Sequence, residues 1–227
     1  MKHARLTLAL AFAVAALPAF AQHHEEIDKV NGSITAEPGQ VYDDLSTVNG
    51  SIKVESNAQA DDVETVNGSI AGGDGIRVRS LSTVNGGIRV GAQAQVADTI
   101  ETVNGGIYVD TGGHVGEGIS TVNGAIGLVQ TEVGGGIETV NGDVTVGVGS
   151  HVHGGIHVEK NNNHGWFQMG KQKPPRIVIG PNARVDGALV FEREVVLYVH
   201  STAKVGRISG ATPIAFSTQT APDDRRD

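Results

Sequence analysis

Three closely spaced histidines are the residues of this chain whose types and spacing best suit chemistry. His151, His153 and His157 lie at even spacing, so an extended strand would place their side chains on one face. Clustered imidazoles can bind Zn²⁺ or change charge near pH 6.5. No cysteine or carboxylate in the neighbouring sequence completes a ligand set. We therefore expect a solvated strand face without metal or cofactor, and these three residues are the ligands that a metal would use.

Residues 160–176 form a second candidate site, because they hold the only tryptophan of the chain among several cations. Exposed aromatic side chains beside lysine and arginine can stack on a sugar ring or dock against an acidic protein surface. A structural alternative is that Trp166 and Phe167 fold onto the body of the protein and cover it. The binding candidates in this segment are Trp166, Phe167, Lys171, Lys173 and Arg176.

Catalytic signatures are missing from the sequence. It contains no Ser-His-Asp arrangement, no phosphate-binding glycine loop and no clustered pair of carboxylates. The acidic residues are spread along the chain at regular intervals, whereas a lyase would need them gathered in a cleft. We therefore expect a protein that is not an enzyme.

The first 21 residues have the pattern of a secretory signal peptide. A basic start at Lys2 and Arg5 precedes an apolar run from Leu6 to Leu17, and Ala19-Phe20-Ala21 resembles a cleavage site. Removing this segment changes the net charge from −8 to about −10, because it holds two cations and no acid. We expect the mature chain, residues 22–227, in the periplasm or outside the cell.

The composition of the chain argues against some classes of binding partner. An acidic chain repels phosphate backbones, which argues against nucleic acid. No apolar run after the signal is long enough to cross a bilayer, and the chain has no cysteine for a disulfide or a lipid anchor. The 32 glycines and the scarcity of aromatic residues fit tight turns between short strands.

A repeated Thr-Val-Asn-Gly motif, followed by one variable residue and then Ile or Val, organises the chain that positions these groups. A period of 18 or 19 residues separates successive copies, and the first copy has Lys29 in place of threonine. Such regularity over seven copies predicts a stacked repeat protein. The asparagines of the motif are Asn31, Asn49, Asn67, Asn85, Asn104, Asn123 and Asn141.

Apolar columns in the aligned copies predict an all-β, single-domain parallel β-helix, or β-solenoid, of about ten rungs with roughly 18–20 residues each. In the second copy we expect Val48, Gly50, Ile52 and Val54 to point inward because they share one parity. The residues between them would then point outward. No segment after the signal has helical periodicity, so we expect almost no helix.

One outward column alternates between an acid and serine. Carboxylates stacked at a one-rung spacing of about 4.8 Å would repel each other, and alternation doubles their separation. The pattern therefore indicates parallel stacking in register. Its residues are Asp28, Ser46, Glu64, Ser82, Glu101, Ser120 and Glu138.

The repeat is interrupted in its second half and then resumes. Residues 160–176 lack an apolar period and contain two prolines, which predicts a lateral loop. Ile179-Gly-Pro-Asn-Ala183-Arg-Val185 and a matching pattern at residues 199–205 indicate further rungs, so the solenoid should span residues 22–210. Residues 211–227 are polar, and we expect a disordered tail.

The Val-Asn-Gly-x-Ile copies with short glycine-rich returns resemble a bacterial adhesin-type β-solenoid family of unknown function, over roughly residues 27–158. The stretch from Ile179 to Ala188 is similar to rungs of bactofilin-like polymer-forming β-helices. These resemblances imply a structural or surface role, and they transfer no catalytic residue.

The sequence thus predicts an exported, non-enzymatic, structural or adhesin-like β-solenoid. Its expected partner is a protein or an envelope polysaccharide, and its uncovered ends could join further copies of the chain. The alternative is an envelope carbohydrate-binding, or carbohydrate-active, protein that uses the segment around Trp166.

Overall fold

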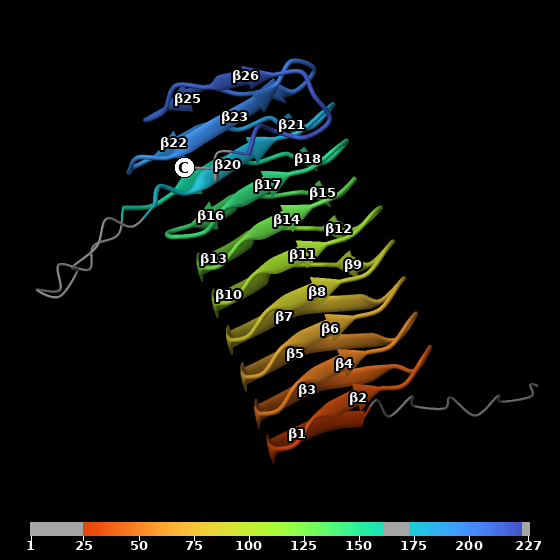
Figure 1. The fold of residues 1–227 in the computed structure, drawn as a ribbon. Helices are drawn as coiled ribbons and strands as arrows, with labels where there is room; N and C mark the ends of the chain where they lie inside the picture. Colours follow the sequence, from red (N-terminus) through yellow and green to blue (C-terminus); the bar gives the residue numbers. More distant parts are fainter. Residues whose placement is uncertain (1–24, 161–172, 224–227) are drawn as a thin grey trace, which may run out of the picture.

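Short parallel strands stacked in rungs make up the computed structural model, which describes residues 25–160 and 173–223 (Figure 1). Each rung contributes one strand to a ten-stranded sheet and one long or two short strands to a 16-stranded sheet. The part of the chain that is described contains no helix. The prediction of an all-β parallel solenoid of about ten rungs is confirmed.

The ten-stranded sheet takes one strand of about three residues from each rung, in chain order. Its strands are β2 (Ile34–Ala36), β4 (Ile52–Val54), β6 (Ile70–Gly72), β8 (Ile88–Val90), β11 (Ile107–Val109), β14 (Ile126–Leu128), β17 (Val144–Val146), β20 (Arg176–Ile179), β23 (Val196–His200) and β26 (Ile214–Phe216).

The 16-stranded sheet begins with four long strands and continues with pairs of short ones. The long strands are β1 (Glu25–Asn31), β3 (Tyr42–Asn49), β5 (Gln59–Asn67) and β7 (Arg77–Asn85). The short ones are β9 (Gln95–Val96), β10 (Ile100–Asn104), β12 (His114–Val115), β13 (Ile119–Asn123), β15 (Glu132–Val133), β16 (Ile137–Thr139), β18 (His151–Val152), β19 (Ile156–Val158), β21 (Arg184–Val185), β22 (Leu189–Phe191), β24 (Lys204–Val205) and β25 (Ile208–Ser209).

A single extra residue explains why the long strands give way to pairs. Two residues separate Val78 from Leu81 in β7, whereas three separate their partners Val96 and Ile100 in the next rung. The third residue cannot pair in register, so the strand breaks into β9 and β10. From this rung onward the sheet consists of two rows of short strands, one continuing from β9 and the other from β10. The outward side chains of each row form their own columns.

The hydrophobic core runs the length of the stack. Its columns are formed by identical or similar apolar residues in register, such as Ile52 over Ile70 and Leu81 beside Ile100. These side chains are almost completely buried and pack in one continuous cluster. Each rung therefore depends on its neighbours for burial, as expected for a solenoid.

The expected inward valine column is wrong, because it is threonine that points inward. Thr47 is 3% exposed, whereas Val48 is 41% exposed, and the same reversal recurs in later copies of the motif. The chain turns a corner at Asn49-Gly50, just after the inward Thr47, and both Val48 and Asn49 are exposed, so the parity that holds at Ile52 and Val54 does not extend back through the turn. The buried threonine hydroxyl is satisfied, since Thr47 Oγ1 donates to Gly32 O of the preceding rung at 3.1 Å.

The asparagines of the motif form a continuous ladder on the outside of this corner. Each side-chain amide donates to the amide oxygen of the preceding asparagine, from Asn141 back to Asn31, at 2.9–3.1 Å. We call this column the asparagine ladder. At its upper end the Arg193 guanidinium donates to Asn141 Oδ1 at 2.5 Å, where the next rung has no asparagine to continue the series.

The glycine after each asparagine allows the corners to stack closely. A Cβ at Gly86 would lie 1.9 Å from the carbonyl oxygen of Gly68 one rung away, which is a severe clash. Any side chain here would force two rungs apart. The glycine of the motif is therefore required by packing between rungs.

The predicted disordered tail is wrong for the part that the structure describes. Residues Ile214–Phe216 form β26, which pairs with β23 and continues the stack. Phe216 is buried and meets the rings of Tyr198 and His200 edge-on, at centroid distances of 6.4 and 5.0 Å. An aromatic side chain with a second apolar patch to cover can thus order a polar segment.

The lateral loop is shorter at its end than expected. Arg176 begins β20, where its backbone N–H donates to Asp143 Oδ1 at 2.8 Å and its guanidinium lies 5.0 Å from the centre of the Tyr198 ring. Lys173 is exposed. Trp166, Phe167 and Lys171 lie outside the described residues.

Candidate functional site

Two outward columns at the upper rungs bring charged side chains together. In the first, the residue before each buried valine stacks in register, so that Glu132 of β15 lies between His114 of β12 and His151 of β18. Arg184 of β21 follows His151 in the same column. The strand pairing alone places Glu132 between the histidines of the two adjacent rungs.

The second column follows the buried valines and changes from glycine to charged residues. Gly116 and Gly134 occupy it in the lower rungs, His153 and Asp186 in the next two, as the backbone N–H groups of successive members bond to the rung below. His153 and Asp186 therefore stand next to the first column, one rung apart. We call Glu132, His151, His153 and Asp186 the histidine–carboxylate cluster.

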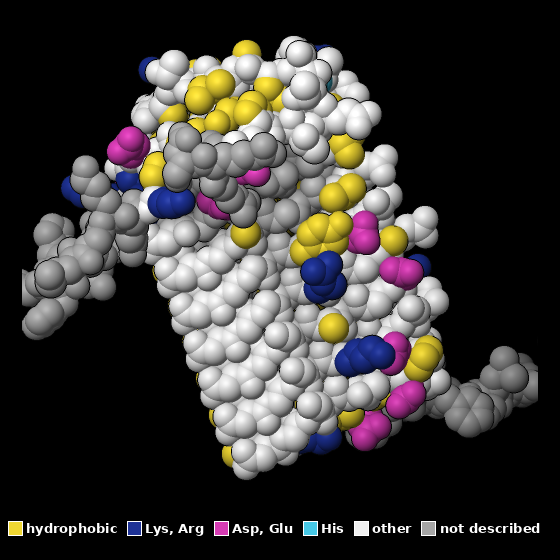
Figure 2. All heavy atoms as spheres, viewed as in Figure 1, with side chains coloured by type: hydrophobic (Ala, Val, Ile, Leu, Met, Phe, Trp, Pro, Cys, Tyr) yellow, Lys and Arg dark blue, Asp and Glu magenta, His cyan; other side chains and the backbone are white. Residues whose placement is uncertain are grey.

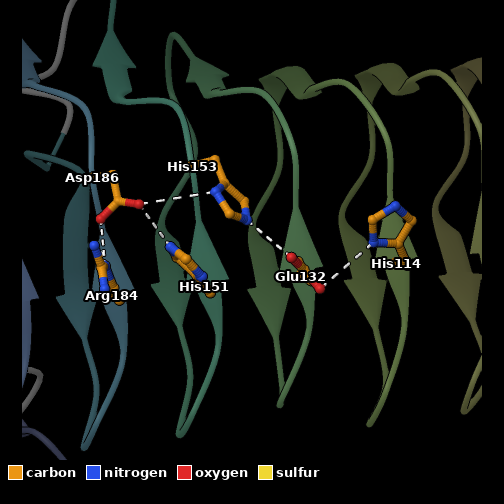
Figure 3. A network of polar contacts seen from close by, with 6 residues as sticks. All are labelled: His114, Glu132, His151, His153, Arg184 and Asp186. Atoms are coloured by element: carbon orange, nitrogen blue, oxygen red, sulfur yellow. Dashed lines mark hydrogen bonds and ion pairs between the residues drawn. The ribbon is translucent and has the colours of Figure 1, made fainter.

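Within this cluster the imidazoles and carboxylates contact one another closely (Figure 3). His153 Nε2 lies 2.9 Å from Glu132 Oε1, and His151 Nε2 lies 2.8 Å from Asp186 Oδ2. The second nitrogen of His153, Nδ1, faces Asp186 Oδ2 at 3.9 Å. The centres of the two imidazole rings are 3.9 Å apart. Each carboxylate is thus held against at least one ring nitrogen.

The surrounding cations favour the charged form of both carboxylates. The hydrogen bond with His153, with smaller contributions from the charges of His114 and His151, lowers the pKa of Glu132 below its usual value. Hydrogen bonds with Arg184 and then with His151 lower the pKa of Asp186. Both groups are exposed, so solvent weakens these interactions.

The structure unites two of the three predicted histidines and separates the third. His151 and His153 share the cluster, whereas His157 lies on β19 and its Nε2 is 3.0 Å from Glu192 Oε1. This contact lowers the pKa of Glu192, helped by the backbone N–H of Lys160. His157 therefore belongs to a separate ion pair.

Carboxylates lie beside these histidines in the structure, although the neighbouring sequence offers none that would complete a ligand set. Glu132, His151 and His153 each offer a ligand atom, and these atoms lie within 4.8 Å of one another. Glu132 comes from one rung earlier and Asp186 from beyond the interrupting segment, so neither is close to the histidines in sequence. An alignment of the rungs on their buried valines shows the relation, because Glu132 precedes Val133 as His151 precedes Val152.

A shallow groove of roughly 530 Å³ crosses five rungs on the outer face of the ten-stranded sheet. Small residues such as Gly87, Gly106 and Ala125 form one side of it. On the other side the Arg89 guanidinium lies 4.8 Å from the centre of the Tyr108 ring. The groove thus offers an aromatic surface and a cation to an extended ligand.

The outward valines of the motif form a second surface along the stack, beside the asparagine ladder. The side chains of Val48, Val66, Val84, Val103 and Val122 are each 38–41% exposed, and that of Val30 is 68% exposed. We call these six residues the valine stripe. Figure 2 shows one flank of the stack as a broad face without charged side chains, bordered by a row where charged and apolar side chains gather.

Comparison of the chain with protein-family models, with curated proteins and with solved structures found no match. In the described ranges, 25–160 and 173–223, no helix has the length and apolar character needed to cross a membrane.

Proposed function

We propose that this protein is an exported, non-enzymatic, structural or adhesin-like β-solenoid that acts through contacts with a protein or with the surface of the cell envelope. The single observation that carries the proposal is the valine stripe. Its apolar side chains recur at one-rung spacing and remain partly exposed along the stack. Contiguous exposed apolar surface of this kind is typical of contact surfaces.

The neighbouring asparagine ladder supports the same role. Each amide bonds to the next along the stack, and the surface they form is regular and uncharged. A partner can bury such a surface without removing water from a charged group. The valine stripe supplies apolar area for that contact.

The ends of the stack support association between copies. Among the described residues, β1 and β2 pair on one side only, as do β24, β25 and β26 at the other end. Strand edges of this kind pair with other strands when nothing covers them. Export rests on the sequence pattern of residues 1–21.

Sedimentation velocity of residues 22–227 over a wide concentration range tests association. We expect species larger than the monomer at high concentration. Val84→Lys combined with Val103→Lys should weaken lateral contact, whereas Gln93→Lys with Thr111→Lys adds the same charge at exposed positions in the turns after β8 and β11 and should change little. Binding of the labelled protein to isolated cell envelopes tests the other partner class. A strict monomer that does not bind envelopes would contradict the proposal.

A second candidate function, binding of an envelope polysaccharide, is favoured by the groove beside Tyr108. Aromatic rings stack on sugars, and a groove that crosses five rungs suits an extended chain. Affinity electrophoresis in envelope polysaccharides should show retardation that Tyr108→Ala removes. Trp166 is the only tryptophan, so a fluorescence change on titration reports a contact of its own segment, and the retardation of Trp166→Ala in the same gels shows whether that segment contributes to binding. Unretarded migration and unchanged fluorescence would leave the structural function alone.

A further inference from the structure

We propose that Glu132, His151 and His153 bind a divalent transition-metal ion of the Zn²⁺ type. Each of these side chains offers one ligand atom, and the three atoms lie within 4.8 Å of one another. Two imidazoles and one carboxylate are a common set of protein ligands for zinc when a fourth position is left open. The site lies outside the surfaces that the proposed function uses.

The orientation of the rings leaves the correct nitrogens for a metal. His151 directs Nε2 toward Asp186, at 2.8 Å, and its other ring nitrogen lies on the side of the ring toward Glu132 (Figure 3). His153 directs Nδ1 toward Asp186, at 3.9 Å, and Nε2 toward Glu132, at 2.9 Å. The His153 nitrogen that contacts Glu132 and one ring nitrogen of His151 thus lie within 4.8 Å of each other and of a Glu132 oxygen.

Asp186 acts as a positioning residue for both imidazoles. A histidine that binds a metal usually donates its other ring N–H to a carboxylate or a carbonyl, which fixes the ring and its tautomer. Asp186 accepts a hydrogen bond from His151 and lies 3.9 Å from Nδ1 of His153, and Arg184 in turn bonds to its second oxygen. Because Arg184 neutralises Asp186, Glu132 supplies the negative charge that faces the metal.

The fit requires only small movements of exposed side chains. Ligand atoms at zinc-like distances of about 2.0–2.1 Å from the ion are roughly 3.4 Å apart in a tetrahedral arrangement. His153 Nε2 and Glu132 Oε1 are now 2.9 Å apart, at the distance of a hydrogen bond that the metal would replace. The backbones that carry the ligands are fixed by paired strands of adjacent rungs, so the site is largely formed before the ion enters.

The ligand types select among cations. Imidazole suits zinc, copper, nickel and cobalt, whereas calcium and magnesium require mainly oxygen ligands. With two nitrogen ligands and one carboxylate, the site should discriminate strongly against Ca²⁺ and Mg²⁺ at equal concentration.

The pair formed by His157 and Glu192 provides a matched control. It has the same two residue types at a similar distance, 3.0 Å, and a similar exposure, but only one imidazole. A non-specific effect of surface histidines would appear at both places. A metal site appears only where two histidines and a carboxylate converge.

Isothermal titration calorimetry of untagged residues 22–227 with ZnCl₂ tests the proposal, and the absorption bands of bound Co²⁺ report the ligands. We expect one zinc ion to bind per chain, with an affinity that depends on the residues of the histidine–carboxylate cluster. His151→Ala, His153→Ala and Glu132→Gln should each weaken binding by at least about tenfold, and His157→Ala should leave it unchanged. MgCl₂ should give no binding heat at the same concentration.

Two results would overturn the proposal. One is zinc binding that persists unchanged in both His151→Ala and His153→Ala, and the other is equal loss in His157→Ala. Circular dichroism of each variant shows that its fold is intact. Asp186→Asn tests the positioning role, since it should weaken zinc binding about tenfold while the Co²⁺ bands keep their positions, because the ligands themselves remain. Unchanged affinity in that variant would remove Asp186 from the site.

Discussion

The asparagine ladder and the histidine–carboxylate cluster are both columns of polar side chains on the outside of the same stack, and they solve the same problem differently. In the ladder, one residue type repeats in register through seven rungs and each member bonds to the next. In the cluster, residue types change from rung to rung, and contacts form between imidazoles and carboxylates, with the Arg184 guanidinium beside them.

The difference follows from the chemistry of the side chains. A carboxamide has both a donor and an acceptor, so identical copies can bond to one another indefinitely. A carboxylate only accepts and repels its own copy, so it must alternate with another residue. The alternation of Glu64 and Ser82, and of Glu132 with His114 and His151, obeys this rule. Repetition of one residue type therefore gives the asparagine ladder a structural role. Where the repetition is lost, the histidine–carboxylate cluster has side chains that can bind a ligand.

The largest expected effect comes from the close packing under the ladder. Gly86→Ala places a Cβ 1.9 Å from Gly68 O and should lower the free energy of unfolding by about 3 kcal/mol or more. Gly127→Ala is the control, because the nearest atom to its Cβ is in the movable Tyr108 ring at 3.3 Å. Chemical denaturation measures both. Equal stability of the two variants would show that neighbouring rungs can move apart at this corner, and that the asparagine ladder does not require their close packing.

A second test addresses which residue of the motif points into the core. Thr83→Val removes the buried hydroxyl that donates to Gly68 O at 2.9 Å and should cost about 1–2 kcal/mol of unfolding free energy. Val84→Thr changes the adjacent, exposed side chain and should cost less than about 0.5 kcal/mol. If the costs were reversed, the valine would be the inward residue and the orientation of the ladder beside it would be wrong.

A third test compares the two columns directly. Asn85→Ala removes two amide hydrogen bonds, one on each side, and should destabilise the protein by about 1 kcal/mol. His153→Ala removes an exposed ion pair and should cost less than about 0.5 kcal/mol. Thermal unfolding followed by circular dichroism compares the variants. A larger loss at His153 would mean that the cluster, too, is a structural element.

The smallest expected effect is the contribution of the histidine–carboxylate cluster to the loss of stability at low pH. Because folding lowers the pKa of Glu132 and Asp186, their contribution to stability is fully present above the usual values of 4.5 and 3.8 and is lost as pH falls through the lower folded values. The double variant Glu132→Gln with Asp186→Asn should therefore have a melting temperature that declines less steeply below pH 4.5. Asn85→Ala should keep the steeper decline of the wild type. Parallel curves for all three would show that the cluster has no electrostatic effect on stability.

Local periodicity predicts the rungs well because the same pattern recurs. It fails at the corners, where the alternation between inward and outward residues is interrupted. Ile52 and Val54 were predictable as core residues, since alternation holds within a strand. The exposure of Val48 was not, because the corner at Gly50 resets the alternation and no single residue marks by how much. β26 was missed for another reason: Phe216 is buried against Tyr198 and Val178 of the two preceding rungs, in a patch separate from the main core.

The candidate site was half predictable. His151 and His153 are visible because they are neighbours on one strand and its corner. Glu132 and Asp186 become their neighbours only through the stacking register, which brings together residues about one rung apart, and through the resumption of rungs after residues 161–172. Arg193 at the upper end of the ladder is equally hidden, because it contacts Asn141 across 52 positions of the chain.

The amides of the asparagine ladder all point the same way, so the two ends of the rod differ chemically. Every Nδ2 donates toward the first rung and every Oδ1 accepts from the next, so the small dipoles of seven carboxamides add in one direction. One end of the series presents the amide N–H of Asn31, and the other is closed by a guanidinium. A second rod that prolonged this series at Asn31 would have to offer an acceptor there, and a copy meeting it with its own Asn31 amide would offer only a donor. The side-chain chemistry of one repeated residue thus distinguishes head from tail in any fibre built on it.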